Sequence, residues 1–511
     1  MKRFKEPVAS RYQLALLPLT VDDFVPAHAR SRVIADLLDA MDCTALENTY
    51  RGGGAPAYHP RTLLKILVFA YSEGIRSSRN IAVCCTRDLH YLFLAEMSRP
   101  DHRTLCTFRR KNGDAIAQLF RDTVLACKTS GLVLLEHVAV DGTKIEADVS
   151  SKETYNRGRV EDAIAYTEAC IAAILGDAEA QDARDDQPRL SLDAPTLVDT
   201  PASVDTPALV DTVALLDTAA PLDTPAPAAA PEPPTPAVSS PETAALVRKL
   251  SRRKERARAA RERLCETGGK AQGATDLESR VMKTPAGNRP AYNAQAAVDG
   301  ANQIIVAAFV TQSCTDGQQM AAMLPHIVAN TGAQPGCVTA DCGYNTLETL
   351  YALEEAGVLG YLAEREDQKR KALYVHDAQT DVLRLPATAD TAELTLRFHG
   401  HRTKEGKRFR VYRHAATGKE TWVSEDPERE LSLRGSMHER MTSASGKAIY
   451  RLRQQVVEPV FGHLKTVLRL RRFLLRGLAG ARIEYLLACA AHNLKKYAHA
   501  QVARGRGAVA A

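Results

Sequence analysis

A proline-rich tract is the feature that most limits how this chain can fold. Twelve of its 25 prolines fall between residues 188 and 241, where there is no glycine and no aromatic residue. Within the tract, Asp recurs every six residues from Asp193 to Asp223. Such a segment cannot bury enough apolar surface to form a packed core. We therefore expect a disordered linker over 183–245. The aspartates do not predict calcium binding, because the turn glycines of such sites are absent.

The remaining sequence is long enough for more than one folded unit. At 511 residues the chain exceeds what one core usually supports, so two or three domains are expected. The net charge of +6 and pI near 8.7 are mildly basic. The eleven cysteines are odd in number and lack ligand spacing, which argues against a disulfide framework and a zinc site. No signal segment or membrane-spanning run is visible. We expect a cytoplasmic protein with no membrane partner.

Residues 1–130 predict a helical N-terminal domain. The segment "HPRTLLKILVFAYSEGI" (59–75) has apolar residues at helical spacing and a proline in the first turn. Two further segments, "SSRNIAVCCTRDLHYLFLAE" and "RPDHRTLCTFRRKNGDAIAQLF", begin on helix-capping residues and carry arginines. Short capped basic helices are typical of a helix-turn-helix DNA-binding arrangement. On composition alone, a packing domain with a solvated charged face is favoured over it.

The pattern changes near residue 131 and predicts an α/β domain. "LVLLEHVAVDGTKIEA" indicates a buried strand that ends at Asp141. The segments 291–300 and 302–312 predict a hairpin that turns at Gly300, followed by a helix at 317–329. "CVTADCGYNTLETLYALEEAGVLGYLAE" then predicts strand, Asp341, helix and strand.

Two insertions are expected to interrupt this α/β domain. It would occupy 131–150 and 286–500, divided by a first insertion over 151–285 without strand character. That insertion holds a helical piece at 158–175 and another at 246–264, where nine basic residues face two acidic ones. The basic piece predicts either a solvated basic helix or a helix that tracks phosphates or forms a coiled pair, and it would pair with the first helix as an antiparallel arm. Residues 366–445 form a second, irregular insertion with the only tryptophan, Trp422, and 446–500 predict two helices.

Three carboxylates are candidates for chemistry. Asp141 and Asp341 each follow a buried strand and precede a glycine-containing turn, a position where α/β sheets bind ligands. Glu458 is the only acid between residues 446 and 482, among nine Lys or Arg. If the three converge, they repel one another unless cations lie between them, which favours two Mg²⁺ ions with Mn²⁺ as a substitute. Alternatively, Glu458 only neutralises cations on its own helix.

These residues lie in sequence blocks that resemble a known family. "VAVDGTKIEADVS", "YNAQAAVDGANQIIVAAFVTQ", "TADCGYNTLETL" and "YRLRQQVVEPVFGHLK" resemble, in order, the signature blocks of bacterial insertion-sequence transposases of the DDE class, in the IS-five-like group. "YHPRTLLKILVFAYSEGIRSSRNI" and "PDHRTLCTFRR" resemble that group's helical N-terminal domain. The resemblance implies a ribonuclease-H-like mixed sheet with flanking helices. Its first Asp lies on the central strand, its second Asp after the fourth strand and its Glu on a late helix.

The resemblance also implies the activity and its partners. Asp141, Asp341 and Glu458 would bind the metal ions for DNA cleavage at the element's ends and strand transfer into target DNA. The DNA-binding residues would be Tyr450, Arg453 and Lys465 near the cut, and Arg103, Arg109 and Arg110 at the terminal inverted repeat. A homodimer would hold two ends together, and the protein would be associated with the nucleoid. Trp422 either stacks on an unpaired base or packs internally.

The chain departs from the family pattern at two places. Arg453 precedes Glu458 by five residues, where the commonest version has four, so either Arg451 or Arg453 would face the DNA. The cysteine cluster that similar transposases carry is absent from 412–430. Two alternatives remain open. One is a catalytically decayed transposase that acts as a sequence-specific DNA-binding protein, and the other is a ribonuclease-H-like DNA nuclease.

Overall fold

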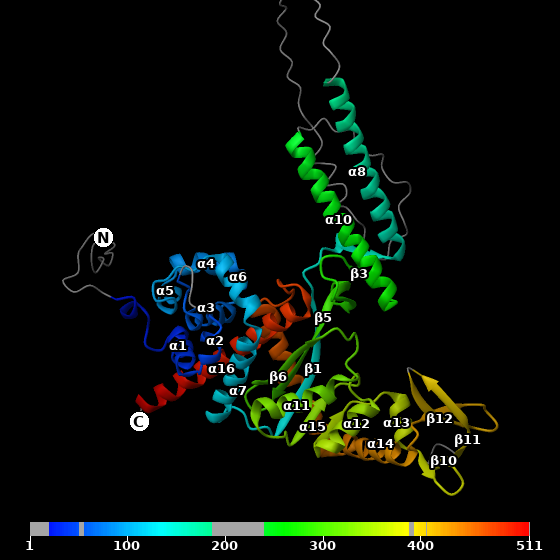
Figure 1. Ribbon diagram of the computed structural model, residues 1–511. Helices are drawn as coiled ribbons and strands as arrows, with labels where there is room; N and C mark the ends of the chain where they lie inside the picture. The colour runs from blue at the N-terminus through cyan, green and yellow to red at the C-terminus, as the bar shows by residue number, and fades with distance from the viewer. Residues whose placement is uncertain (1–19, 51–55, 186–239, 388–392, 405, 510–511) are drawn as a thin grey trace, which may run out of the picture.

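The computed structural model describes residues 20–50, 56–185, 240–387, 393–404 and 406–509 (Figure 1). It is a mixed α/β protein, as predicted from the sequence. The expected linker over 183–245 lies mostly outside the described residues.

The N-terminal part is helical. Its helices are α1 (Arg30–Ala40), α2 (Thr44–Glu47), α3 (Pro60–Ser72), α4 (Ser78–Arg87), α5 (Leu89–Leu94), α6 (His102–Lys111) and α7 (Gly113–Thr129), after a short 3₁₀ turn (Asp22–Phe24). The helix predicted at 59–75 is confirmed as α3, which is buried along most of its length. Asp88 caps α5 and Asp101 caps α6 through backbone N–H groups, and these bonds set where each helix begins.

A six-stranded mixed sheet forms the centre of the molecule. Its strands are β1 (His137–Glu146), β4 (Arg280–Thr284), β5 (Gly287–Asp299), β6 (Ile305–Thr311), β7 (Cys337–Ala340) and β8 (Leu359–Leu362). β5 pairs antiparallel with β1, β4 and β6, whereas β1, β7 and β8 run parallel to one another. The predicted hairpin is confirmed as β5 and β6. The predicted order of strand, Asp341, helix and strand is also confirmed.

The strand that carries Asp141 is longer than expected. The prediction that it ends at Asp141 is wrong, because β1 stays paired with β5 as far as Glu146. Its pairing with β7 stops at Ala139. Asp141 therefore lies within β1, two residues beyond the last residue that pairs with β7, and at this point β1 is paired only with β5. Pairing with β5 holds the backbone of Asp141 in place. The unpaired side of β1 faces the end of β7, which Asp341 follows.

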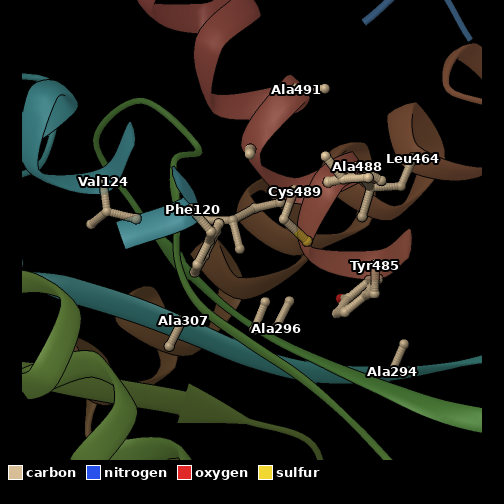
Figure 2. Packing of buried hydrophobic residues seen from close by; sticks show 14 of the residues in the cluster. Phe120, Val124, Ala294, Ala296, Ala307, Leu464, Tyr485, Ala488, Cys489 and Ala491 are labelled. Atoms are coloured by element: carbon tan, nitrogen blue, oxygen red, sulfur yellow. The ribbon is translucent and has the colours of Figure 1, made fainter. Parts of the chain in front are cut away.

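Helices cover the sheet and join it to the N-terminal part. They are α11 (Gln319–Thr331), α12 (Leu347–Ala356), α15 (Ala444–Gly462), a π-helical turn (His463–Val467) and α16 (Gly477–Val509). α15 packs on β1 and β7, while α16 packs on β6, α3 and α7. Figure 2 shows Cys489 of α16 among Phe120 of α7, Ala296 of β5 and Ala307 of β6. One continuous core therefore spans the N-terminal helices and the sheet.

The first insertion contains a pair of long helices. α10 (Ser240–Thr267) packs along α8 (Arg157–Asp185), and the pair projects from the sheet (Figure 1). Arg258 forms an ion pair with Glu168, and Arg261 with Glu161, so part of the basic charge of α10 is neutralised by α8. The expectation of no strands in 151–285 is wrong. Short strands β2 (Thr154–Asn156) and β3 (Ala271–Gly273) pair with each other, and β4 joins the central sheet.

Where the structure describes it, the second insertion consists of regular helices and strands, not the irregular structure expected. It contains α13 (Glu366–Ala372), β9 (Val375–Asp377), β10 (Val382–Leu385), β11 (Leu394–Lys404), β12 (Lys407–Arg413), β13 (Glu420–Val423) and α14 (Pro427–Thr442). The strands form an antiparallel sheet in the order β13-β12-β11-β10-β9. Most of β11 is exposed on both faces, so it lacks the alternation of apolar and polar residues that marks a half-buried strand.

Candidate active site

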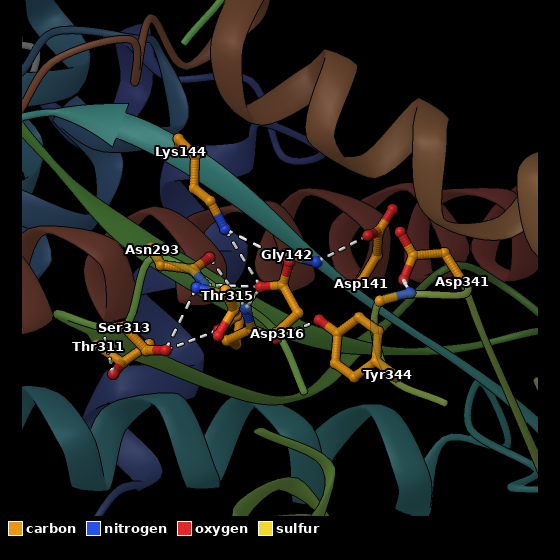
Figure 3. Close-up of polar contacts among 12 residues, drawn as sticks. Asp141, Gly142, Lys144, Asn293, Thr311, Ser313, Thr315, Asp316, Asp341 and Tyr344 are labelled. Atoms are coloured by element: carbon orange, nitrogen blue, oxygen red, sulfur yellow. Dashed lines mark hydrogen bonds and ion pairs between the residues drawn. The ribbon is translucent and has the colours of Figure 1, made fainter. Parts of the chain in front are cut away.

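The two predicted aspartates lie side by side on neighbouring strands. Ala139 of β1 is in register with Thr339 of β7, and each Asp follows two residues later. Figure 3 shows the two carboxylates next to each other. Asp141 accepts the N–H of Gly142 at 2.8 Å, and Asp341 accepts the N–H of Gly343 at 2.9 Å. The N–H groups of Gly142, within β1, and of Gly343, in the turn after β7, thus fix one oxygen of each carboxylate.

The ionised form of Asp141 is disfavoured by burial and by neighbouring acids. Burial raises the pKa of Asp141 to about 6, and the nearby Asp341 and Asp316 act in the same direction. The guanidinium of Arg453 on α15 opposes this effect, since its Nη2 lies 2.9 Å from Asp141 Oδ2. Placing these carboxylates together therefore requires a cation, and in this structure Arg453 supplies that charge.

Tyr450 and Lys465 also line the site. Burial raises the pKa of Tyr450, with Arg453 opposing and Asp341 adding to the effect, so its hydroxyl lies within electrostatic range of these residues. Lys465, in the π-helical turn, donates to the hydroxyl of Thr143 on β1. Burial lowers the pKa of Lys465, and Asp141 acts in the opposite direction. The structure thus brings Tyr450, Arg453 and Lys465 around the two aspartates.

Glu458 does not join this group. Its side chain is exposed on α15, whereas that of Arg453 is 11% exposed. At about 100° per residue, a spacing of five residues places Glu458 about 140° around the helix from Arg453, whereas a spacing of four would give about 40°. Val457 occupies that closer position and is buried. Within the part of the chain that the structure describes, no group of three or more His, Cys, Asp or Glu side chains could hold a metal ion.

The pair of aspartates nevertheless fits a divalent cation. Hard cations take carboxylate oxygens, and adjacent, partly buried carboxylates favour positive charge between them. Two of the three predicted ligands are thus together, whereas Glu458 is exposed on α15.

A polar network that the sequence did not reveal lies beneath Gly142. Asp316 accepts hydrogen bonds from Asn293 (2.6 Å) and Gln295 (2.7 Å), and Lys144 Nζ lies 3.2 Å from it (Figure 3). A Cβ at position 142 would collide with the Gln295 amide and lie 2.8 Å from Asp316. Asn293 and Gln295 occupy alternate positions of an otherwise apolar strand, and this pattern in the sequence could have predicted a polar site on one face of the sheet. Asp316 had no such signal.

The three N-terminal arginines fall into two groups. Arg103 and Arg110 are exposed on α6, seven residues apart and therefore on one face of the helix. Arg109 is only 2% exposed, donates to the Tyr71 hydroxyl at 2.8 Å and lies 3.5 Å from Glu484 of α16. Its burial leaves no surface for DNA, so only Arg103 and Arg110 stay as candidates for reading the inverted repeat.

Trp422 lies on β13 and is partly exposed. Its ring centroid is 6.3 Å from that of Phe409, and the guanidinium of Arg402 lies 5.4 Å from its centroid. These contacts favour an internal packing role over the stacking role.

Comparison with protein families gave two matches. Residues 19–111 match a transposase domain (DUF772), and residues 410–498 match a transposase DDE domain. The chain therefore carries the domains of a DDE transposase, which confirms the resemblance, while the IS-five-like group stays a prediction. The second match includes Tyr450, Arg453, Glu458 and Lys465, whereas Asp141 and Asp341 lie outside both.

Searches of curated proteins and of solved structures gave no match. Among the described residues, no helix has both the length and the apolar character needed to cross a membrane.

Proposed function

We propose that this protein is a transposase that cuts DNA at the ends of its element and joins them to target DNA. The observation that carries the proposal is the pair Asp141 and Asp341 on neighbouring strands, with Arg453 and Lys465 directed at it. Such a site combines carboxylates for metal ions with cations for a polyanion. The positions also agree with a ribonuclease-H-like fold, since Asp141 lies on the central strand β1, Asp341 follows β7 and Glu458 lies on the late helix α15.

The proposed metal site is built on the two aspartates. Bound Mg²⁺ ions, or Mn²⁺ in their place, would supply activation of the attacking oxygen and stabilisation of the leaving oxygen. Asp141 and Asp341 would hold the ions from the sheet, and Glu458, which is exposed on α15, would complete the set only after its side chain turns toward them. Arg453 occupies one oxygen of Asp141, so it would have to release that oxygen. The freed guanidinium would then bind a phosphate of the DNA.

The remaining residues would hold the DNA. Tyr450 and Lys465 lie beside the aspartates, where they can contact the phosphates around the cut. Arg103 and Arg110 share the exposed face of α6 and would contact the terminal inverted repeat. Two copies of the chain would bring two ends together, and the protein would act at the nucleoid.

The test is cleavage of a labelled duplex that carries the element's ends, with Mg²⁺ present. We expect Asp141→Asn, Asp341→Asn and Glu458→Gln to bind the duplex but not to cut it. Glu439→Gln, an exposed carboxylate on α14, is the matched control and should cut as wild type does. Full cleavage by either Asp variant would refute the site. Loss in both Asp variants but not in Glu458→Gln would remove only Glu458 from the ligand set.

A second function has a specific observation in its favour. Glu458 is exposed on α15 and is not grouped with the two aspartates, as expected for a decayed copy that binds DNA without cutting it. Tight binding of the end duplex by the wild type, with no cleavage in Mg²⁺ or Mn²⁺, would establish that function. Cleavage without any joining to a target duplex would instead indicate a nuclease.

A further inference from the structure

The segment that follows Lys465 returns the chain to the end of β1, the strand that carries Asp141. After the π-helical turn, Arg469 adopts a left-handed conformation (φ 56°), and the fully buried Leu470 and Phe473 anchor the segment. The backbone then pairs with the end of β1, with Glu146 N–H donating to Arg471 O at 3.2 Å and Phe473 N–H donating to Glu146 O at 2.8 Å. Position 471 is therefore fixed beside the strand that carries Asp141.

The arginines of this segment differ in whether they form ion pairs. Arg472 forms an ion pair with Glu146 at 3.1 Å, and Arg476 pairs with Asp148 at 2.9 Å. Arg471 is exposed, and its Nε donates only a long 3.4 Å hydrogen bond to the carbonyl oxygen of Lys465. It forms no ion pair with any residue that the structure describes. Its guanidinium therefore keeps most of its donors available.

Arg471 lies close enough to Lys465 for the two charges to act on each other. Burial lowers the pKa of Lys465, Asp141 opposes this effect, and Arg471 adds a smaller lowering effect. Asp141 thus compensates the charge of Lys465 in part, and a further anion bound by both Lys465 and Arg471 would offset the repulsion between these two cations. The Lys465 amine reaches Thr143 on β1, so such an anion would lie at the mouth of the site.

We propose that Arg471 binds a backbone phosphate of the DNA strand held at the Asp141–Asp341 site, together with Lys465. This inference rests on the proposed function and adds a residue to it. The planar guanidinium is suited to phosphate because it offers two parallel N–H donors. Because the contact is to a phosphate, Arg471 contributes affinity without reading sequence.

The test is binding of two labelled duplexes, one with the element's end and one scrambled, in EDTA so that cleavage does not occur. Arg471→Gln should weaken binding of both duplexes about tenfold. The slope of log affinity against log salt should become shallower by about one. Arg471→Lys should keep the slope and recover part of the affinity. Arg472→Gln, the matched control, should bind as wild type does, because Glu146 already neutralises that charge.

The outcomes separate this inference from the proposed function. One outcome is that Arg471→Gln and Arg472→Gln bind with the same affinity and the same salt dependence, while the wild type cuts the end duplex. In that case the inference fails and the proposed function stands. If the wild type binds neither duplex, both fail. A loss confined to the element-end duplex would make Arg471 a sequence reader and overturn the phosphate contact.

Discussion

A buried ion cluster in the second insertion allows a quantitative test of the structure. Glu430 of α14 is 1% exposed and accepts Lys371 Nζ at 2.7 Å, Arg434 Nε at 2.8 Å and the N–H of Ser424 at 2.7 Å. It thereby connects α13, α14 and the end of β13. Burial alone would raise the pKa of Glu430, but Lys371 and Arg434 outweigh it and lower the pKa to about 2.

The lowered pKa sets both the size and the pH range of the effect. The fall from the ordinary 4.5 to about 2 corresponds to about 3 kcal/mol of folding free energy at neutral pH. Because the folded-state pKa is the lower one, this stability is present above about pH 4.5 and is lost as the pH falls toward 2. At pH 7, Glu430→Gln should therefore unfold more easily by about 3 kcal/mol, which is comparable to breaking a buried pair.

The fluorescence of Trp422 reports on unfolding of the second insertion. It is the only tryptophan in the chain and lies on β13, two residues before Ser424. Urea unfolding followed by its fluorescence should show a lower midpoint for Glu430→Gln at pH 7, and the difference from wild type should narrow below about pH 4.5. Glu428→Gln, an exposed neighbour on the same helix, should change little. Equal midpoints at pH 7, or a gap that does not change with pH, would refute the reasoning.

Two further substitutions test packing, one beneath the candidate site and one between α16 and the N-terminal helices. Gly142→Ala should cost about 1–3 kcal/mol and reduce cleavage, because its Cβ would collide with the Gln295 amide; Gly176→Ala on α8, where a Cβ meets nothing within 4 Å, is the control and should not destabilise. Differential scanning calorimetry and the cleavage assay would measure both. Glu484→Gln should destabilise the fold, because it leaves two buried arginines without their carboxylate; the cost should stay below that of a well-compensated buried pair, about 3–5 kcal/mol, because burial raises the pKa of Glu484 and so disfavours its charge. Limited proteolysis should then cut the N-terminal helices faster, whereas Glu168→Gln in an exposed pair should not change the rate.

The sequence predicted those parts of the site whose signals are local. Asp141 and Asp341 could be found because apolar strands followed by an acid and a glycine are visible within a few residues. The burial of Arg109 could not be found, since its partners Tyr71 and Glu484 are distant in the sequence. Asp316 was missed for the same reason, because its donors come from β1 and β5.

The spacing on α15 shows why helix register decides the chemistry. Arg451 and Arg453 were both candidates to face the site, and the structure selects Arg453, which contacts Asp141. Its neighbour at four residues is Val457, which belongs to the core. The helix therefore cannot turn Glu458 toward the aspartates without exposing that valine. In the proposed function, Glu458 must reach the ions by the extension of its own side chain, with α15 left in place. Replacement of Arg453 at Asp141 by a metal ion would keep the negative charge of the two aspartates neutralised. The core packing of α15 would therefore not have to change when the ion binds.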